Sequence, residues 1–172
     1  MVPRKGCVKS MEKTMNETTC DISDKLHPDV QYLEPVYKIY GAKTSFSGHI
    51  VTVKCYEDNS LVEEALKGNG KESVLVIDAG GSMNCAMLGD KRAADAINNE
   101  WEGIIVHGLI RDSVAINGME IGIRALGVYP LKSIKNGVGD NNLIVNFSGV
   151  TFTPGEYLYA DEDGVIVVKE KL

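Results

Sequence analysis

The sequence has few of the residues that build nitrogen- or sulfur-ligated metal sites. It contains three histidines and four cysteines among 172 residues, and no two cysteines form a CxxC pair. A zinc finger or zinc ribbon is therefore excluded, because such sites need closely spaced Cys and His ligands. Unpaired cysteines are typical of a reducing compartment, so we expect free thiols and a cytoplasmic protein.

Long apolar runs and an excess of positive charge are also missing. No run approaches the roughly 20 apolar residues that a membrane span needs, so we expect no membrane partner. The net charge is −6 and the isoelectric point is about 5.1, which disfavours direct binding of nucleic acid through its phosphates. A small anionic ligand would need a local cation or converging N–H groups to overcome this acidic field.

The chain does have enough apolar residues, 44% of the total, to bury the core of one globular domain. Its first 18 residues differ from the rest, because they carry four basic side chains and lack the apolar stretch of a secretory signal. We expect a flexible N-terminal extension at residues 1–18 and a single α/β domain at residues 19–172.

Two kinds of pattern alternate along this domain. Capping residues and helically spaced apolar residues predict helices at 18–28, 59–70 and 91–101, and residues 113–122 look like a short helical turn. Apolar and β-branched runs predict strands at 45–56, 74–77, 103–110 and 123–130. Residues 142–168 are rich in strand formers, with turn signals at Pro154-Gly155 and Asp163-Gly164. The order predicts a mixed α/β sheet whose last strands are antiparallel.

The segment 59–70 carries detailed helix signals. Ser60 and Glu63 have the spacing of a capping box, in which each side chain accepts a hydrogen bond from the other residue's backbone. Gly68 is a typical C-terminal stop. We therefore expect a compact helix that begins at Ser60 and ends before Gly68.

Residues 74–112 predict a βαβ unit with charged residues at its strand ends. Such units are right-handed and make their two strands parallel, so both carboxyl ends lie at one edge of the sheet. Ligands of open α/β sheets bind at that edge. Asp90 follows the loop after the first strand, and Arg111 and Asp112 follow the second. We therefore expect these three side chains to converge.

Each of these groups suits a task in binding a small anion. The glycine-rich loop from Gly80 to Gly89 leads into a helix N-terminus, where free N–H groups and the helix dipole favour an anion. Arg111 can hold a carboxylate through two hydrogen bonds. Asp90 and Asp112 supply the oxygen ligands that Mg²⁺ or Mn²⁺ prefers.

A purely structural interpretation accounts for the same residues. Asp90 is a good N-cap for the helix at 91–101, Asp112 can cap the turn that follows it, and Arg111 suits a solvated surface. His107 lies within an apolar strand, which favours a core histidine with satisfied hydrogen bonds over a catalytic base. The residue pattern leaves both interpretations open.

Several segments together resemble the RraA-like family. They are "LGDKRAADAI", "NEWEGIIVHGLIRD", "IGIRALGVYP" and "VNFSGVTFTPGEYLYADEDGVIV", which occur in order within a resemblance that extends from about Cys20 to Val168. The family contains the regulator of ribonuclease E activity A and the class II 4-hydroxy-4-methyl-2-oxoglutarate aldolases. The resemblance implies a swivelling β/β/α-type domain that assembles as a ring-shaped homotrimer or a higher oligomer.

The resemblance also implies roles for an Asp-x20-Arg-Asp pattern, which falls here on Asp90, Arg111 and Asp112. By this likeness, Asp112 contacts the divalent metal, Arg111 holds the pyruvyl carboxylate, and Asp90 orients a metal-bound water. The anion site is implied to be lined by Asp90 and by the backbone of Met87, Leu88 and Gly89.

Two functions follow from the resemblance. The first is a lyase that depends on Mg²⁺ or Mn²⁺ and acts on a small 2-oxo acid, cleaving 4-hydroxy-4-methyl-2-oxoglutarate to pyruvate and decarboxylating oxaloacetate. The alternative is a protein that binds a ribonuclease of the ribonuclease E type and inhibits it without catalysis. The chain resembles the short regulator overall, yet it retains both aspartates of the catalytic pattern.

Overall fold

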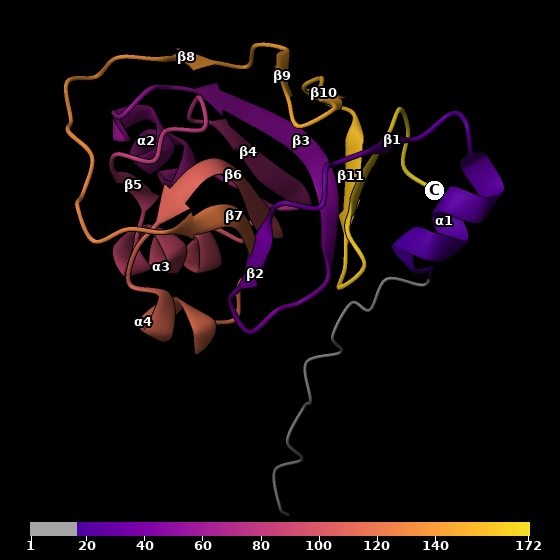
Figure 1. Cartoon of the computed structure of the whole chain (residues 1–172), viewed down its shortest axis with the longest axis horizontal. Coiled ribbons are helices and arrows are strands. Elements are labelled where there is room, and N and C mark those ends of the chain that lie inside the picture. The colour runs from indigo at the N-terminus through magenta and orange to yellow at the C-terminus, as the bar shows by residue number, and fades with distance from the viewer. Residues whose placement is uncertain (1–16) are drawn as a thin grey trace, which may run out of the picture.

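A mixed β-sheet organises the part of the chain that the computed structural model describes, residues 17–172 (Figure 1). Its ten strands are β1 (Gln31–Tyr32), β2 (Lys38–Tyr40), β3 (Phe46–Lys54), β4 (Ser73–Asp78), β5 (Ala86–Leu88), β6 (Gly103–Ile110), β7 (Ile123–Val128), β8 (Asp140–Asn141), β11 (Tyr157–Ala160) and β12 (Val165–Val168). The strand order is β1-β12-β11-β3-β4-β6-β7-β2, with β5 beside β6 and β8 beside β3. The predicted α/β class is confirmed.

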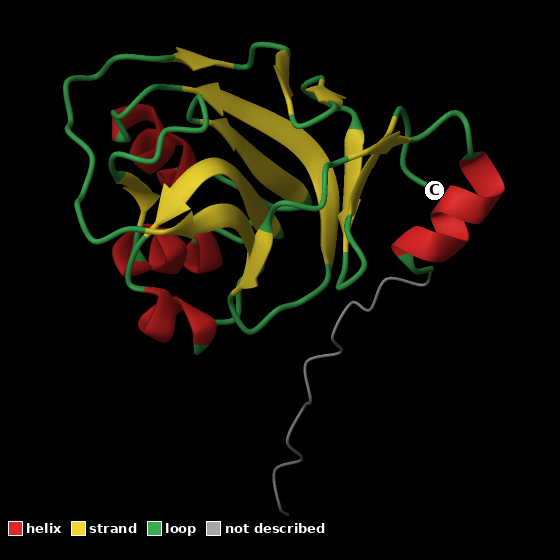
Figure 2. Ribbon diagram, viewed as in Figure 1, coloured by secondary structure: helices red, strands yellow, loops and turns green. Residues whose placement is uncertain are grey.

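Helices cover one face of this sheet, and a small hairpin covers the other (Figure 2). The helices α2 (Ser60–Lys67), α3 (Asp90–Asn98) and α4 (Ser113–Asn117) pack on the side chains of Leu75, Ile77 and Ile104. On the opposite face, Val76 and Ile105 pack against the hairpin of β9 (Val145–Phe147) and β10 (Val150–Phe152). Alternate residues of β4 therefore enter two different cores, as the continuous apolar run predicts.

The first helix stands apart from the others. Helix α1 (Thr19–Leu26) lies at the far end of the sheet, where Ile22 packs against Tyr157 and Ile166. Thr18 caps this helix in a capping box with Asp21. The rest of the expected N-terminal extension, residues 1–16, lies outside the described residues, so the predicted domain boundary stays a prediction.

The predicted βαβ unit is present, and its two strands are direct neighbours. Strand β4 pairs with β6 in parallel register, with Ile77 opposite Val106. Strand β7 continues the parallel set beside β6, while β11 and β12 are antiparallel as expected. The carboxyl ends of β4 and β6 therefore share one edge of the sheet, and β7 adds a third strand end to that edge.

Two local predictions about the central helix were wrong. The segment before Asp90 was expected to be a loop, but Ala86–Leu88 form the short strand β5 beside β6. Helix α3 begins at Asp90 and ends at Asn98, so Trp101 is not part of it. Glu100 breaks the helix with a positive φ of 64°, and Trp101 then packs into the core, where its indole N–H donates to the carbonyl of Gly68.

The capping box expected at Ser60 and Glu63 was also wrong. Asn59 is the N-cap of α2 and makes no side-chain cap bond. Ser60 is instead the first helical residue. Its hydroxyl donates to the buried carboxylate of Asp58 at 2.6 Å and accepts the backbone N–H of Gly137 at 3.0 Å. Glu63 is thereby free to bind basic side chains of other segments. Gly68 ends the helix as predicted.

None of the helices within residues 17–172 combines the length and the hydropathy that crossing a bilayer requires.

Candidate active site

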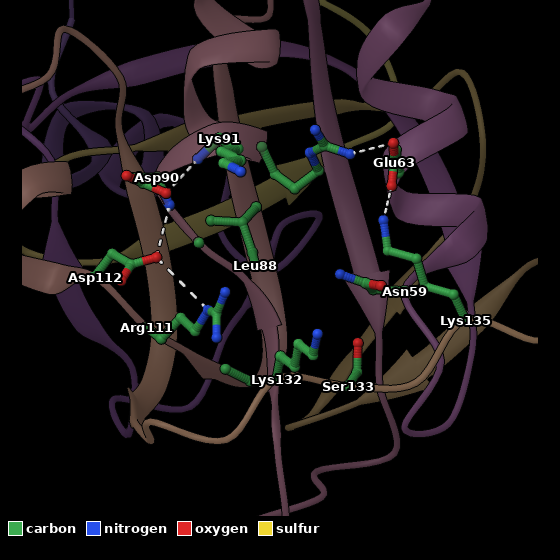
Figure 3. A pocket seen from close by; sticks show the side chains of 13 residues that line it. Asn59, Glu63, Leu88, Asp90, Lys91, Arg111, Asp112, Lys132, Ser133 and Lys135 are labelled. Carbon is green, nitrogen blue, oxygen red and sulfur yellow. Dashed lines mark hydrogen bonds and ion pairs between the residues drawn. The ribbon is translucent and has the colours of Figure 1, made fainter.

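A cavity of about 340 Å³ opens at the edge of the sheet where β5, β6 and β7 end (Figure 3). Its volume falls at the small end of the range for small-molecule sites, roughly 300–1,000 Å³. The lining residues come from β5, from the starts of α2 and α3, and from the segments that follow β6 and β7. They are Asn59, Glu63, Ala86, Leu88, Gly89, Asp90, Lys91, Arg92, Arg111, Asp112, Lys132, Ser133 and Lys135.

The structure brings Asp90, Arg111 and Asp112 together at this cavity (Figure 3). The backbone N–H of Arg111 donates to the carbonyl of Leu88 at 2.9 Å, which holds the end of β6 against β5. The Arg111 Nε lies 3.6 Å from Asp112 Oδ2, and the same carboxylate oxygen accepts the backbone N–H of Asp90 at 3.3 Å. The side chains of Arg111 and Asp112 remain 40% and 38% exposed, so a ligand can reach both.

Neither aspartate is a simple helix cap. Gly89 is the N-cap of α3, and Asp90 is the first helical residue, with its carboxylate on the backbone N–H of Lys91. Asp112 occupies the N-cap position of α4 but makes no side-chain cap bond there. Its carboxylate turns toward the start of α3 instead, from a left-handed backbone conformation with φ 57°. Among non-glycine residues, aspartate is one of the few that adopt this conformation readily.

Gly89 makes this close approach possible. A Cβ atom at this position would lie 2.6 Å from Asp112 Oδ2 and 3.3 Å from the Arg111 Cγ. Because both distances are shorter than ordinary contacts, any larger residue would displace the carboxylate. The glycine therefore fixes how closely Asp112 sits to the first turn of α3.

The N-terminus of α3 contributes backbone donors to the cavity. The backbone N–H groups of Asp90 and Lys91 are taken by the two aspartate carboxylates. Within residues 17–172, the third, that of Arg92, has no acceptor. A free N–H group at a helix start, together with the helix dipole, favours an anion at this point.

Basic side chains outnumber acidic ones around the cavity. Five lining residues are basic, namely Lys91, Arg92, Arg111, Lys132 and Lys135, whereas three are acidic, namely Glu63, Asp90 and Asp112. The excess of positive charge is local, because the whole chain carries a net charge of −6. The cavity therefore provides the local cations that a small anionic ligand needs to overcome the acidic surface.

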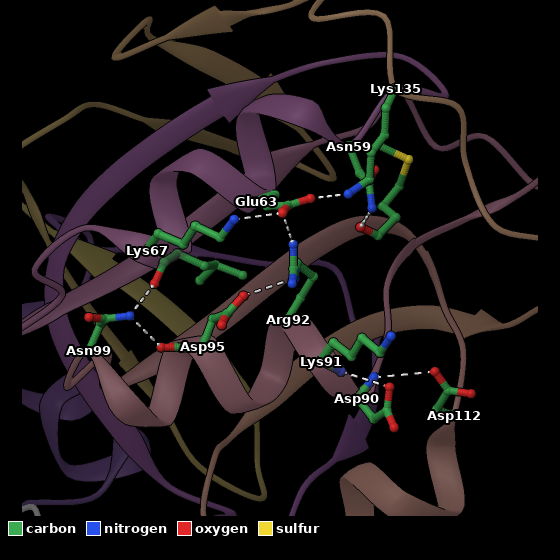
Figure 4. A network of polar contacts seen from close by, with 12 residues as sticks. Asn59, Glu63, Lys67, Asp90, Lys91, Arg92, Asp95, Asn99, Asp112 and Lys135 are labelled. Atoms are coloured by element: carbon green, nitrogen blue, oxygen red, sulfur yellow. Dashed lines mark hydrogen bonds and ion pairs between the residues drawn. The ribbon is translucent and has the colours of Figure 1, made fainter.

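Glu63 ties two of these cations to the cavity wall (Figure 4). Its carboxylate pairs with Lys135, with Lys67 at 2.7 Å and with Arg92 at 2.5 Å. Hydrogen bonds from Lys135, Lys67 and Arg92 hold the pKa of Glu63 well below its usual range. Arg92 is further fixed by Asp95 at 3.0 Å. The Arg92 guanidinium is therefore held at the cavity wall by the carboxylates of Glu63 and Asp95.

The segment after β7 completes the cavity and is anchored from below by Asp58. The carboxylate of Asp58 accepts the backbone N–H groups of Asn136 at 2.8 Å and of Val138 at 3.1 Å. Burial alone would raise the pKa of Asp58, but these bonds and those from Ser60 lower it to about 2. An ionised, buried carboxylate thus holds the chain that carries Lys132, Ser133 and Lys135.

Sequence reasoning missed these residues because it considered only two strand ends. Strand β7 also ends at this edge of the sheet, and the lysines at positions 132 and 135 follow it closely. Their spacing after a strand that stops at a proline was the available signal. Three buried polar atoms of the lining, Asn59 Oδ1, Arg92 Nε and Ser133 Oγ, make no hydrogen bond within residues 17–172. Arg92 Nε still has Asp95 within ion-pair distance, whereas the other two atoms are left for a polar ligand.

The residues predicted to line the anion site differ in their exposure. Leu88, Gly89 and Asp90 line the cavity. Met87 is not among the lining residues and is fully buried, and its carbonyl accepts a hydrogen bond from Asn59 at 3.3 Å. The substrate contacts of these residues stay predictions, as do the roles of Arg111 and Asp112.

The donor set at Asp112 fits a magnesium-like ion. Within residues 17–172, no group of three or more His, Cys, Asp or Glu side chains is placed to hold a metal. Mg²⁺, however, is usually held by only one or two carboxylates, with waters and substrate oxygens as its other ligands. Asp112 offers a partly exposed carboxylate with one oxygen, Oδ1, left without a hydrogen bond to the described residues.

His107 lies outside this site, as the structural interpretation predicts. Its Nδ1 is 2.7 Å from the Tyr37 hydroxyl, and its ring stacks on Phe147 with centroids 4.5 Å apart. Burial lowers the pKa of His107 and raises the pKa of Tyr37 to about 12. His107 borders a separate, open cavity of about 500 Å³ on the hairpin side of the sheet.

Comparison with known proteins places these features in context. A family model described as RraA-like, Aldolase/RraA, matches residues 19–167. A relative from Dechloromonas aromatica is 56% identical over 149 residues, which cover 86% of this chain and 91% of the relative. A relative from Aromatoleum aromaticum is 51% identical over 158 residues, which cover 92% of this chain and 99% of the relative. Both carry the name "Putative 4-hydroxy-4-methyl-2-oxoglutarate aldolase".

Two solved structures share the fold over nearly the whole chain. One, from Geobacillus kaustophilus, is described as an S-adenosylmethionine: 2-dimethylmenaquinone methyltransferase. It has a TM-score of 0.89 and 44% identity, and the match covers 91% of this chain and 97% of that one. The other is described as the RNA-processing inhibitor RraA from Thermus thermophilis. It has a TM-score of 0.88 and 38% identity, with coverage of 92% and 96%.

Proposed function

This chain belongs to the RraA-like family, and we propose that it is a lyase that requires a divalent metal and acts on 2-oxo acids. Its reactions are the cleavage of 4-hydroxy-4-methyl-2-oxoglutarate to pyruvate and the decarboxylation of oxaloacetate. The aldolase names of the relatives support this proposal. The observation that carries it is the meeting of Asp90, Arg111 and Asp112 at a cavity with an excess of basic residues.

Arg111 and the start of α3 bind the pyruvyl end of the substrate. The guanidinium of Arg111 pairs with the carboxylate next to the 2-oxo group, since arginine presents two parallel N–H donors to a carboxylate. The open backbone N–H of Arg92 adds a further donor at the helix terminus. These contacts orient the 2-oxo group toward Asp112.

Asp112 is the residue that would hold the divalent cation, Mg²⁺ or Mn²⁺. When bound, the cation supplies Lewis-acid chemistry at the 2-oxo group. Asp112 is suited to this because its carboxylate is fixed by the backbone N–H of Asp90 and restrained by the close approach of Gly89. The carboxylate therefore needs little reorganisation when a cation arrives.

Asp90 assists removal of the 4-hydroxyl proton in the cleavage reaction. The bond between C3 and C4 of 4-hydroxy-4-methyl-2-oxoglutarate breaks as a proton leaves the 4-hydroxyl, so that C4 becomes the carbonyl carbon of one pyruvate. The electron pair of the broken bond remains on the C3 fragment as pyruvate enolate, which takes up a proton to give the second pyruvate. Asp90 at the cavity mouth positions the water that accepts the hydroxyl proton.

Decarboxylation of oxaloacetate needs fewer of these residues than aldol cleavage does. Its C3–C4 bond breaks with release of carbon dioxide and leaves the same pyruvate enolate. No hydroxyl proton has to be removed. Arg111 and Asp112 are therefore needed for both reactions, whereas Asp90 is needed mainly for aldol cleavage.

Pyruvate release from both substrates tests this proposal. The protein is stripped of metal with a chelator and assayed with and without added Mg²⁺ or Mn²⁺. We expect activity only with metal, strong loss of both activities in Arg111→Ala and Asp112→Ala, and preferential loss of aldol cleavage in Asp90→Asn. Metal-independent pyruvate release, or wild-type rates in the Arg111 and Asp112 variants, would refute the assignment.

Assembly as a homotrimer or a larger ring is part of the proposal. From the end of β7 to the residues just before β9, the chain exposes several apolar side chains, as expected of a surface that contacts another subunit. They are Val128, Tyr129, Leu131, Ile134, Val138, Leu143 and Ile144. Light scattering coupled to gel filtration should give a mass of at least three chains, and a monomeric mass at micromolar concentration would contradict it.

Regulation of a ribonuclease is the second candidate function. The observation that favours it is the close structural likeness to the RNA-processing inhibitor from Thermus thermophilis. RNA cleavage by a ribonuclease of the ribonuclease E type is measured with and without the protein. Inhibition that survives Arg111→Ala would assign regulation to a surface other than the cavity, and the absence of both binding and inhibition would reject this role for the ribonuclease used.

A further inference from the structure

The basic residues of the cavity fall into two groups. Arg92 and Lys135 are paired with Glu63, which neutralises them and holds them against the wall. Arg111 is only loosely paired with Asp112. Within residues 17–172, Lys91 and Lys132 have no acidic partner within ion-pair distance. If a ligand carries a second anionic group, Lys91 and Lys132 are therefore the lysines available to pair with it.

Lys132 is the more firmly placed of these two lysines. Its backbone forms a parallel bridge with Ala86. The residues on either side both bond to Ala86, because the Ala86 N–H donates to Leu131 at 2.7 Å and the Ser133 N–H donates to the Ala86 carbonyl at 3.2 Å. Figure 3 shows the Lys132 side chain rising into the cavity on the same side of Leu88 as the Arg111 guanidinium.

Ser133 adds a hydroxyl with an unmet hydrogen-bonding requirement. The residue is only 6% exposed, and within residues 17–172 its Oγ has no hydrogen-bond partner. A buried hydroxyl without a partner costs free energy. Ser133 belongs to the cavity lining, so a ligand oxygen that reached this hydroxyl would satisfy it. Figure 3 shows this hydroxyl pointing into the same space as the Lys132 side chain.

We propose that Lys132 and Ser133 form the subsite for the distal carboxylate of the substrate, which makes the enzyme selective for 2-oxo acids that carry a carboxylate at both ends. The inference rests on the proposed lyase function. The carboxylate next to the 2-oxo group binds Arg111, and the far carboxylate accepts hydrogen bonds from the Lys132 ammonium and the Ser133 hydroxyl. A monocarboxylate such as 4-hydroxy-2-oxopentanoate leaves this subsite empty.

Glu63 sharpens this selectivity. By neutralising Arg92 and Lys135 it removes two competing cations from the same wall. The far carboxylate is therefore directed to one place, on the strand-bridged segment next to β5. Lys132 and Ser133 act here as binding and specificity residues, and neither takes part in the proton transfer.

The test compares two substrates in matched variants. The kcat/KM for pyruvate release is measured with 4-hydroxy-4-methyl-2-oxoglutarate and with 4-hydroxy-2-oxopentanoate, which lacks the distal carboxylate. In Lys132→Met we expect the ratio of the two kcat/KM values to fall roughly 10- to 100-fold, the effect of losing one charged hydrogen-bonding partner. Ser133→Ala should lower the ratio by a smaller factor, and Lys132→Arg should restore most of it. Lys169→Met, at an exposed position after β12, is the matched control.

Binding of oxalate separates this inference from the proposed function. Oxalate mimics the pyruvyl end alone, so its inhibition constant should change little in Lys132→Met and rise strongly in Arg111→Ala. An unchanged substrate ratio in Lys132→Met overturns the subsite, as does a selective loss in Lys91→Met with none in Lys132→Met. If wild-type protein with metal releases pyruvate neither from these two substrates nor from oxaloacetate, the lyase function itself fails, and the subsite fails with it.

Discussion

Replacing Gly89 by alanine should disable the site while leaving the fold intact. The backbone at Gly89 is extended, with φ −132° and ψ −169°, a conformation that alanine adopts without strain. The added methyl group would nevertheless lie 2.6 Å from Asp112 Oδ2, whereas carbon and oxygen atoms normally stay about 3.3 Å apart or more. The Asp112 carboxylate must therefore move by roughly 0.7 Å.

The size of the effect follows from how steeply catalysis depends on position. A misplacement of about 1 Å can cost roughly 100-fold in rate, so we expect kcat/KM for pyruvate release to fall roughly 30- to 100-fold. The free energy of unfolding should change by less than about 1 kcal/mol, because the reduced freedom of the unfolded chain offsets part of the local strain. Affinity for Mn²⁺, measured by titration calorimetry, should fall together with kcat/KM.

The control is Gly118→Ala, which adds the same methyl group after the neighbouring helix. Its nearest neighbour there is the carbonyl oxygen of Ala115 at 3.5 Å, an ordinary contact. Both variants are compared by urea denaturation and by the pyruvate assay. Wild-type kcat/KM in Gly89→Ala would show that the position of Asp112 does not matter for catalysis, and an equal loss in Gly118→Ala would show that the effect is not specific to the site.

Three further predictions concern stability and titration. Glu63→Gln should lower the free energy of unfolding at pH 7 by roughly 1–3 kcal/mol. Because the folded pKa of Glu63 is depressed, this stabilisation is complete above the usual pKa of 4.5 and is lost as the pH falls below it, so denaturant curves of variant and wild type should converge in acid. The His107 ring should titrate below pH 6.5 in NMR spectra, because burial lowers its pKa in the folded protein. The unfolded chain then binds the proton more readily, so the free energy of unfolding should decrease as the pH falls below 6.5. A measured pKa of 6.5 or above would contradict this. Gly70→Ala should unfold the protein readily, since the methyl group would lie 2.1 Å from the ring of Trp101, and the fluorescence of this single tryptophan reports the loss.

The part of the site that could be predicted was the part that rests on parallel strands. The apolar runs ending before Gly80 and Arg111 predicted two parallel strands, and parallel strands bring their carboxyl ends together whatever the loops do. The convergence of Asp90, Arg111 and Asp112 followed from that rule. The family resemblance then favoured a binding site over a set of helix caps, and the structure shows that the simple caps are not formed.

The basic wall of the cavity was not predictable in the same way. Lys132 and Ser133 are placed by a backbone bridge to Ala86, a residue that the sequence had assigned to a loop. The three-residue strand β5 is too short to show a periodic pattern. It exists because β6 continues past the end of β4 and pairs with β5 at Leu109 and Ile110. Likewise, Glu63 carried a capping signal, but tertiary contacts with Lys135 and Arg92 outweigh that local preference.

The segment after β7 contacts the cavity with some of its side chains and exposes others on the outer surface. Ser133 points inward to the cavity, while Leu131 and Ile134 expose their apolar side chains to the outside. Any partner that binds these outer side chains orders the same few residues of backbone that carry Lys132. Binding of a partner on the outside and binding of substrate in the cavity are then thermodynamically linked. If a bound partner changes the affinity for substrate by some factor, bound substrate changes the affinity for the partner by the same factor.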